Sequence, residues 1–506
     1  MIKMDSTPWK SIPETFAGVD VFITGGSGFM GKVLIEKLLR SCPKVRNVFV
    51  LLRPRKGKLA KERVTDLVQV PLFDKLREES PEQFQKIVPI NGDCSQLKLG
   101  LEEDNIKRMA DVQFIFHAAA SVRFDDPLDK ALLLNTRGTH EVLRWAKTLS
   151  NLKAVVYIST TYSNPEISHV EEKIYPAKID WRKAIEIAET VDPDVLNTLA
   201  EKLSGFAPNT YTFTKGLAEQ ICYDLRQELP VIVFRPSIVI NTETEPMPGW
   251  IENYNGPAGL MSAQTTGILR TTFVSMDCHM NCIPADVSIK AIIIAAWKKS
   301  HSPEGELAIY NSAAEPKKAM SYEFLYEESD YFFHRIPMLK MLWSPSIQAT
   351  TNSMLFTLMF LLYQVIPALF ADAILRVSKT KPFLLKLLRS IFHAQNSLKY
   401  FTTHDWVFET DNFRNLSKNL CELDKIHFDI SYITQGLLEY CSLCILGGRR
   451  YLFKETDDSI KLAFRRLKRF KMADKLLKLA LFVGFAYVLR SYLPTNLMQH
   501  EQILTD

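Results

Sequence analysis

Short apolar segments alternate with amphipathic ones over the first 160 residues and again from about 210 to 235. The apolar segments run on without the every-second-residue polarity of a half-exposed strand. Uninterrupted apolar strands between helices indicate a parallel sheet that is covered on both faces. The sequence therefore predicts a doubly wound, parallel-sheet α/β domain. Its expected strands are residues 19–24, 47–53, 86–92, 112–120, 154–160 and 231–235.

A glycine-rich turn lies between the first expected strand and the first expected helix, with glycines at positions 25, 28 and 31. Such glycines let the backbone turn tightly, approach a pyrophosphate and pack the helix against the strand. The N-terminus of the helix also offers free N–H groups to phosphates. The alternative is a glycine turn without a ligand. We expect a dinucleotide to contact Thr24, Gly25, Gly26, Ser27, Gly28, Phe29, Met30 and Gly31.

Basic residues follow the second expected strand, where an NAD site usually carries a carboxylate. They are Arg53, Arg55 and Lys56. A guanidinium can bind a ribose 2′-phosphate through paired hydrogen bonds, whereas a carboxylate would repel it. The pattern favours NADPH over NADH, with Arg53 as the expected contact, unless these residues are solvated surface bases.

Small or polar residues at the ends of the later strands complete the expected cofactor site. Asp93 stands where an acid could contact the adenine, and the alanines after the fourth strand would let the cofactor lie close to the backbone. His117 is expected to be a structural hydrogen bonder. The chain after the strand at 231–235 would pass near the nicotinamide. The remaining expected cofactor contacts are Asp93, Cys94, Ala118, Ala119, Asn135, Lys215, Pro236 and Ile238.

Tyr211 and Lys215 stand four residues apart in the segment YTFTK, so on a helix both project from one face. An isolated tyrosine has a pKa of about 10, and a neighbouring lysine cation would lower it. The pair could then donate a proton to an oxygen as hydride reaches carbon. Asn135, at the start of the preceding helix, could orient Lys215.

A hydroxyl at the end of the strand at 154–160 could complete a Ser/Thr–Tyr–Lys set by holding a substrate carbonyl. Thr160 is the favoured residue, with Ser159 second and Thr161 also present. At least one of these hydroxyls is expected to satisfy only the local backbone.

Taken together, these motifs resemble the extended short-chain dehydrogenases, and among them the fatty acyl-CoA reductases, or male-sterility-type family. The resemblance rests on TGGSGFMGKVLIEKLL, VLLRPRKG, HAAASVRFDDPL, NTRGT, YISTTYSN, YTFTK, FRPSIV and PGWIEN. It continues into the C-terminal third through FTTHDWVF and GRRY, so it covers nearly the whole chain.

The resemblance implies a Rossmann-type reductase domain followed by a mostly helical domain. It also implies that two NADPH reduce a long- or very-long-chain acyl-CoA to a primary alcohol through a bound aldehyde, as in wax or ether lipid synthesis. Thr160 and Tyr211 would stabilise or protonate the oxygen that gains charge. Three alternatives stay open: an epimerase or dehydratase with bound NAD, a hydroxysteroid dehydrogenase, and a non-catalytic NADPH-binding protein.

We expect three regions: a reductase domain over residues 1–330, a helical domain over 331–455, and a basic segment with a transmembrane anchor over 456–506. Residues 243–267 read as a long loop. The apolar stretch 476–493, which follows a basic cluster, suits a membrane anchor. The stretch 354–375 could cross a bilayer, form a hairpin, lie at the interface or line an acyl site. The endoplasmic reticulum is the expected membrane, with the catalytic domain in the cytosol; peroxisome and lipid droplet are alternatives.

The net charge of +5 over 506 residues gives no indication of a nucleic-acid partner. The eight cysteines are scattered and favour free thiols over disulfides. Cys278 and Cys282 lack a second ligand pair at suitable spacing, so no metal site is expected. The oligomeric state is left open.

Overall fold

The computed structural model describes residues 9–54, 57–205, 207–302 and 306–492. Its centre is a sheet of seven parallel strands in the order β12-β7-β5-β4-β1-β2-β3. This confirms the predicted doubly wound sheet. The strands are β1 (Asp20–Thr24), β2 (Asn47–Leu52), β3 (Ile87–Asn91), β4 (Val112–His117), β5 (Ala154–Ile158), β7 (Val231–Pro236) and β12 (Ala308–Ser312).

Both faces of the sheet are buried, because alternate residues of each strand enter different cores. In β1, Val21 and Ile23 pack with α2 (Phe29–Ser41) and α12 (Ala285–His301), while Phe22 enters the opposite core with α7 (Gly138–Ala146) and α10 (Thr210–Asp224). Two-sided burial explains why these strands are apolar at most positions.

The seventh strand, β12, was not predicted. Its sequence, AIYNS, ends in polar residues that do not suggest a buried strand. Asn311 is nevertheless fully buried, and its side-chain amide donates to the carbonyl oxygens of Val170 and Glu409 at 3.1 and 2.9 Å. Ser312 bonds to Ser288 of α12 at 2.9 Å. These partners are far apart in the sequence, so no local pattern announces them.

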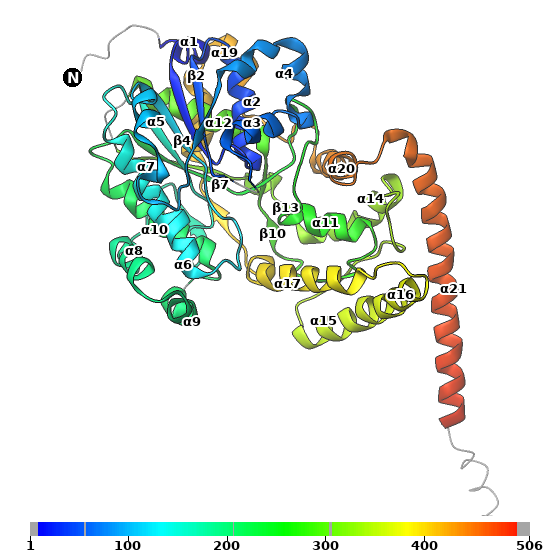
Figure 1. Cartoon of the computed structure of the whole chain (residues 1–506). Helices are drawn as coiled ribbons and strands as arrows, with labels where there is room; N and C mark the ends of the chain where they lie inside the picture. The colour runs from blue at the N-terminus through cyan, green and yellow to red at the C-terminus, as the bar shows by residue number, and fades with distance from the viewer. Residues whose placement is uncertain (1–8, 55–56, 206, 303–305, 493–506) are drawn as a thin grey trace, which may run out of the picture.

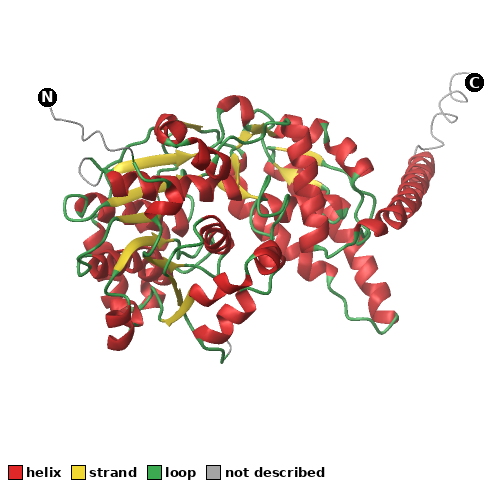
Figure 2. Cartoon of the chain, turned by 90° about the horizontal axis from the view of Figure 1, so that it is seen from above, coloured by secondary structure: helices red, strands yellow, loops and turns green. Residues whose placement is uncertain are grey.

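Further helices surround this core, and Figure 2 shows the last of them projecting away from the body. An insertion after β5 holds α8 (Trp181–Thr190) and α9 (Pro193–Ser204). The expected loop over 243–267 contains a helix, α11 (Pro257–Thr265). The C-terminal part includes α13 (Tyr322–Glu327), α14 (Ser329–Arg335), α15 (Ser353–Phe360), η6 (Leu361–Val365), α16 (Ile366–Val377), α17 (Leu384–Thr402), α18 (Asp411–Arg414), α19 (Glu422–Phe428), α20 (Leu437–Gly447) and α21 (Ile460–Tyr492).

Two short parallel pairings join segments on either side of the expected boundary at 330. β14 (Gln348–Thr350) pairs with β9 (Thr271–Phe273), and β15 (Val407–Phe408) pairs with β6 (His169–Val170). The helical region is therefore bonded to the reductase region through backbone hydrogen bonds, and in Figure 1 the two regions lie side by side.

Among the described residues, one helical segment, Ser353–Val377, is long and apolar enough to cross a membrane by length and composition. It covers the expected stretch 354–375. The expected anchor at 476–493 lies on the outer half of α21, whose side chains are exposed from Lys475 to Arg490; Leu493 falls outside the described residues.

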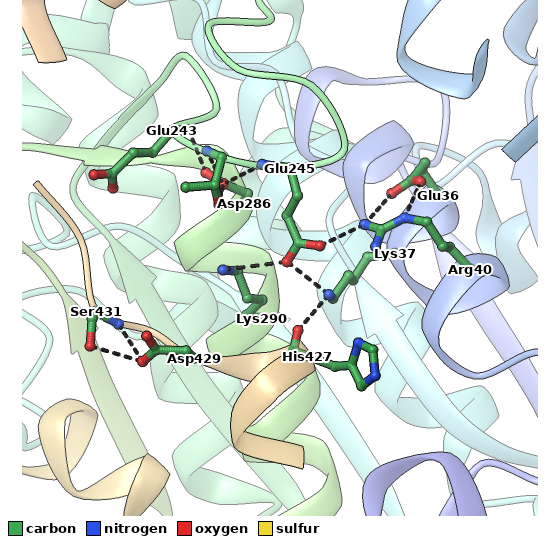
Figure 3. Close-up of polar contacts among 11 residues, drawn as sticks. Glu36, Lys37, Arg40, Glu243, Glu245, Asp286, Lys290, His427, Asp429 and Ser431 are labelled. Atoms are coloured by element: carbon green, nitrogen blue, oxygen red, sulfur yellow. Dashed lines mark hydrogen bonds and ion pairs between the residues drawn. The ribbon is translucent and has the colours of Figure 1, made fainter. Parts of the chain in front are cut away.

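A buried ion cluster fixes the loop after β8 (Ile238–Ile240) against α2 (Figure 3). The Glu245 carboxylate lies 2.8 Å from the Lys37 ammonium, 2.8 Å from the Arg40 guanidinium and 3.3 Å from Lys290 of α12. Burial alone would raise the pKa of Glu245, yet these three cations together lower it to about 2. One carboxylate thus neutralises charges from two helices that are distant in sequence.

The backbone of the same loop is held by Asp286, which accepts from the N–H groups of Glu243, Thr244 and Glu245 at 2.9, 2.9 and 3.1 Å. Lys37 also donates to the carbonyl oxygen of His427 at 2.6 Å, which connects the cluster to the C-terminal region.

We predict that Glu245→Gln lowers the free energy of unfolding by about 3 to 5 kcal/mol at pH 7, because it leaves the buried Lys37 and Lys290 without their carboxylate partner, while Arg40 keeps Glu36. The folded-state pKa of about 2 lies below the ordinary 4.5, so this stabilisation is present above pH 4.5 and disappears as the pH falls through 2. Denaturant unfolding at several pH values measures it. Glu422→Gln, at an exposed pair with Lys425, is the control and should change stability by less than about 0.5 kcal/mol. Equal effects of the two substitutions would contradict the prediction.

Candidate active site

The glycine turn lies at the carboxyl end of β1 and packs against the end of β4. Gly25 has φ 73°, and a Cβ there would stand 2.5 Å from the carbonyl carbon of Ala118. A Cβ on Gly31 would stand 2.3 Å from the Gly25 oxygen. Neither position admits a side chain, so the backbone around the turn is left bare, as pyrophosphate binding requires.

Helix α2 begins at Phe29 with Gly28 as its N-cap, and no side chain caps it. The first N–H groups of a helix have no partner within the helix, and together they form a site for an anion. The turn and the uncapped helix fit the phosphates of a dinucleotide. Gly26 and Ser27 belong to the glycine turn, and Met30 stands at the start of the helix.

A buried polar chain holds β1 and β4 together behind this turn. The Thr24 hydroxyl bonds to His117 Nδ1 at 2.7 Å and accepts from the Ala119 N–H at 3.2 Å. His117 Nε2 bonds to Thr139 at 3.0 Å. Burial lowers the pKa of His117 to about 3, so the ring is neutral near pH 7. Its role is structural, and it keeps Ala118 and Ala119 beside Gly25.

Two arginines meet beyond β2. Arg53 is exposed, and its carbonyl oxygen accepts from the Arg63 guanidinium at 2.6 Å. The same guanidinium donates to the Ser27 hydroxyl of the glycine turn at 3.0 Å. Arg55 and Lys56 lie outside the described residues. Arg63 belongs to α3 (Ala60–Leu67), and the sequence did not indicate it because only the fold brings it to Ser27.

Asp93 and Cys94 follow β3. One Asp93 oxygen accepts from the backbone N–H and the hydroxyl of Ser95 at 2.9 and 2.8 Å. Cys94 is buried beneath Gly138, and burial raises the pKa of its thiol to about 12. The thiol is therefore protonated and packs as a small apolar group.

Tyr211 lies in the first turn of α10, which Asn209 caps by accepting from the Thr212 N–H at 2.9 Å. The Thr160 side chain lies beside the Tyr211 phenol, so the structure brings these two residues together. Burial raises the pKa of Tyr211 to about 12, although the interaction with Thr160 opposes this change. The prediction that Lys215 lowers this pKa is wrong, because burial dominates.

Lys215 lies one turn further along α10 and points to the end of β5. Its ammonium donates to the carbonyl oxygen of Ile158 at 2.6 Å and lies 4.7 Å from the centre of the Tyr157 ring. Burial lowers the pKa of Lys215 to about 7, although the charge of Glu219 opposes this change. Lys215 can therefore gain or lose a proton close to neutral pH.

The three adjacent hydroxyls after β5 have different surroundings. Ser159 donates to the Glu219 carboxylate at 2.6 Å, which turns it away from Tyr211. The buried Thr161 hydroxyl makes no hydrogen bond within the described part of the chain. Thr160 is thus the hydroxyl that contacts the phenol.

Glu219 forms a fully buried ion pair with Arg235 of β7, with two nitrogen–oxygen distances of 2.8 and 2.7 Å. Since Glu219 also binds Ser159, this pair joins α10 to both β5 and β7 directly beneath Tyr211 and Lys215. No local sequence pattern indicates this ion pair.

Asn135 lies on η4 (Leu132–Arg137), a π-helical turn before α7. Its side-chain oxygen accepts from the Ser121 N–H at 2.9 Å, and its amide donates to the Thr214 hydroxyl at 3.0 Å. The Asn135 carbonyl accepts from Thr139 at 2.7 Å. Asn135 therefore holds the residue next to Lys215, and none of these bonds reaches Lys215 itself.

A largely apolar cavity opens beside this site. Ile238, just beyond Pro236 at the end of β7, and Tyr162, two residues after Thr160, line it. Phe401 lines it as well and contacts Phe124, whose ring stacks on Tyr211 at 6.0 Å. The other walls come from α11, α13, α14, α17 and the strands β9, β10 (His279–Met280) and β14.

All eight cysteines are free thiols. Within the part of the chain that the structure describes, no three His, Cys, Asp or Glu side chains gather in a way that could hold a metal ion.

Two family models match the chain, both described as male sterility protein: an NAD-binding model over residues 23–292 and a second model over 363–455. The rat protein named fatty acyl-CoA reductase 1 is 35% identical over 462 residues, covering 91% of this chain and 90% of the relative. The Drosophila melanogaster protein named fatty acyl-CoA reductase wat is 35% identical and covers 89% and 87%.

Solved structures share the fold at low identity. A reductase domain of a nonribosomal peptide synthetase from Mycobacterium tuberculosis aligns with a TM-score of 0.57 at 19% identity, covering 88% of this chain and 93% of that one. The terminal reductase domain of the myxalamid pathway gives 0.56 at 17% identity, with 85% and 90% covered. The full-length relatives confirm the resemblance seen in the motifs and decide against the epimerase and hydroxysteroid dehydrogenase alternatives. The chain belongs to the fatty acyl-CoA reductase family of NAD(P)-binding oxidoreductases.

Proposed function

We propose that this protein uses NADPH to reduce a long- or very-long-chain fatty acyl-CoA to the primary alcohol, with release of CoA through a bound aldehyde. The observation that carries the proposal is the position of the Thr160–Tyr211 pair. The rings of Phe124 and Phe401 connect Tyr211 to an apolar cavity that suits an acyl chain, and the bare glycine turn at the end of β1 suits a dinucleotide.

When bound, NADPH supplies the hydride to the carbonyl carbon. The chain's own task is to hold the carbonyl oxygen and give it a proton. The hydroxyls of Thr160 and Tyr211 can both donate to that oxygen as it gains negative charge. A phenol with a pKa of about 12 stays protonated at neutral pH, so Tyr211 enters the reaction as a proton donor.

Once Tyr211 has given up its proton, a protonated Lys215 one turn away would stabilise the phenolate. Lys215, with a pKa of about 7, would then pass a proton to the phenolate and regain one from solvent, so that Tyr211 can donate again in the second reduction. After the first hydride and proton the substrate is a thiohemiacetal, whose collapse releases the CoA thiol and leaves an aldehyde. A second hydride and proton then give the alcohol.

Arg63, in addition to Arg53, favours NADPH over NADH as the cofactor. Its guanidinium is bound to the glycine turn through Ser27 and lies beside the backbone of Arg53. Two guanidinium groups at the end of β2 suit a 2′-phosphate, and guanidinium–phosphate bonds are strong and paired.

We also propose membrane attachment through the outer half of α21, at the endoplasmic reticulum with the catalytic region in the cytosol. Residues 476–489 of this helix expose large apolar side chains, among them Leu481, Phe482 and Phe485 at 65, 69 and 63%. A basic stretch from Arg465 to Lys475 precedes them, as at the cytosolic end of a membrane helix.

Tyr211→Phe tests the proposed chemistry. We expect it to lower the turnover of a long-chain acyl-CoA by about 100- to 10,000-fold, since it removes the proton donor, while NADPH binding is retained. Turnover is followed as NADPH absorbance and binding by fluorescence titration. The matched control is Tyr223→Phe, at an exposed position on the same helix, which should keep normal turnover. Full activity of Tyr211→Phe would refute the mechanism.

Substitutions at the two neighbouring hydroxyls should separate catalysis from stability. Thr160→Val should lower kcat, and Thr160→Ser should restore most of it. Ser159→Ala should leave the kcat of the folded enzyme nearly unchanged but lower the free energy of unfolding by about 1 to 3 kcal/mol, because Glu219 loses a buried donor. A large loss of kcat in Ser159→Ala with normal activity in Thr160→Val would reverse the assignment.

Loss of either arginine should weaken the preference for NADPH. Arg53→Ala and Arg63→Ala should each raise the KM for NADPH about tenfold or more, which corresponds to one charge-assisted hydrogen bond, while the KM for NADH stays nearly constant. Lys58→Ala, which removes an exposed partner of Asp66, is the control. An unchanged ratio of kcat/KM for the two cofactors in both arginine variants would contradict this assignment.

A further inference from the structure

The segment Ser353–Val377 is buried along one narrow stripe only. Its members are spaced by four residues: Phe356, Phe360, Gln364, Ala368 and Asp372. The rest of its circumference exposes large apolar side chains along the whole length, and an exposed apolar patch of this size marks a surface that meets lipid or another protein. The exposed residues are Met354, Leu355, Leu358, Leu361, Leu362, Tyr363, Ile366, Leu369, Phe370, Ile374 and Val377.

Both ends of this buried stripe are fixed to the body of the protein. At one end the Phe356 ring packs on Phe273 of β9 at 5.6 Å. At the other end Asp372 accepts from the N–H groups of Phe383, Leu384 and Leu385 at 3.1, 3.1 and 3.0 Å, which caps the start of α17. The segment therefore lies beside α17 (Figure 1), and its remaining apolar side chains are exposed.

Arg270 joins this segment to α21. The Arg270 backbone N–H donates to Gln364 at 3.3 Å, and its guanidinium donates to Asp474 of α21 at 3.2 Å. Asp474 also accepts from Trp343 at 2.7 Å and is the last residue of α21 that is buried against the body. The exposed apolar half of α21 thus begins at the level of this segment, beyond which α21 continues away from the body (Figure 1).

We propose that Ser353–Val377 lies in the plane of a membrane and inserts its exposed apolar face into one leaflet, at the level where α21 enters the bilayer. The charge around it suits an anionic lipid surface: residues 353–402 contain six lysines and arginines and one acidic residue, the buried Asp372. Basic residues next to an inserted apolar face attract anionic headgroups. The proposal rests on the anchor proposed for α21 and is independent of the catalytic chemistry.

The packing of α17 argues against a membrane crossing by this segment. Phe392 of α17 contacts Phe356 and Phe360 at ring distances of 6.1 and 5.1 Å, so the two helices run side by side. If one of them crossed the bilayer, the other would lie at the same depth. The exposed face of α17 carries Lys386 and Arg389, and each charge at the centre of a bilayer costs several kcal/mol.

Site-specific fluorescence in vesicles tests the depth of the segment. Cys421 is the one exposed cysteine among the eight, so the full chain with Cys421→Ser provides the background. An environment-sensitive probe is attached at Leu362→Cys or Phe370→Cys, in vesicles of phosphatidylcholine and phosphatidylserine. Leu481→Cys reports the anchor, and Ile426→Cys on α19, 75% exposed and at the opposite end of the molecule, is the control.

We expect lipids with a spin label near the headgroup to quench the probes at 362 and 370 several-fold more than the probe at 426, and more than lipids labelled at the bilayer centre. Quenching at 481 without quenching at 362 and 370 would overturn this proposal but leave the anchor standing. Absence of quenching at all three positions would overturn both. Cross-linking between copies through 362 or 370, without quenching, would identify a protein interface and overturn the membrane assignment.

Sidedness gives a second measurement. In sealed microsomes, Lys381→Cys, in the loop after α16, and Ile426→Cys are treated with a membrane-impermeant maleimide. The proposal predicts that both react from the same side without detergent. If Ser353–Val377 crossed the bilayer, position 381 would lie on the opposite side from the residues before Ser353. A cysteine at 381 that is protected until detergent is added, while the cysteine at 426 reacts, would therefore overturn the proposal.

Discussion

The buried ion pair between Glu219 and Arg235 controls the geometry of the active site. Tyr211, Lys215 and Glu219 are spaced by four residues on α10, so they share one face of the helix. Because Glu219 binds Arg235 of β7 and Ser159 after β5, it fixes both the rotation and the height of α10 above the sheet. That position sets Tyr211 beside Thr160 and Lys215 against the end of β5. A charge pair with no access to solvent tolerates the loss of neither partner, which makes it a rigid support.

Features that depend on local sequence patterns could be predicted, and features that depend on distant partners could not. The strands that build the sheet centre are apolar at most positions, and the glycine turn must be bare, so both were evident in local patterns. β12 and Arg63 were not, because the partners that explain them, such as Val170 and Ser27, come from distant parts of the chain. The pKa of Tyr211 was misjudged for a related reason: spacing shows that Lys215 is near, but only the packed structure shows that burial outweighs it.

The cavity and the helical segment Ser353–Val377, which we propose to meet the membrane, share a wall. Phe273 lines the cavity on one side and packs against Phe356 of the helical segment on the other. Gln395 of α17 lines the cavity and accepts from the Phe273 N–H at 3.4 Å. Under the proposed function and membrane position, an acyl chain held in this cavity would lie close to the membrane surface.

The proposed reaction is tested most directly by its stoichiometry, measured with the purified full-length protein, NADPH and a long-chain acyl-CoA. NADPH oxidised, CoA thiol released and lipid product are measured in one reaction, the last by mass spectrometry. We predict two NADPH oxidised for each CoA released, with the primary alcohol as the product. One NADPH per CoA with accumulation of free aldehyde, or no oxidation of NADPH with any acyl-CoA, would contradict it.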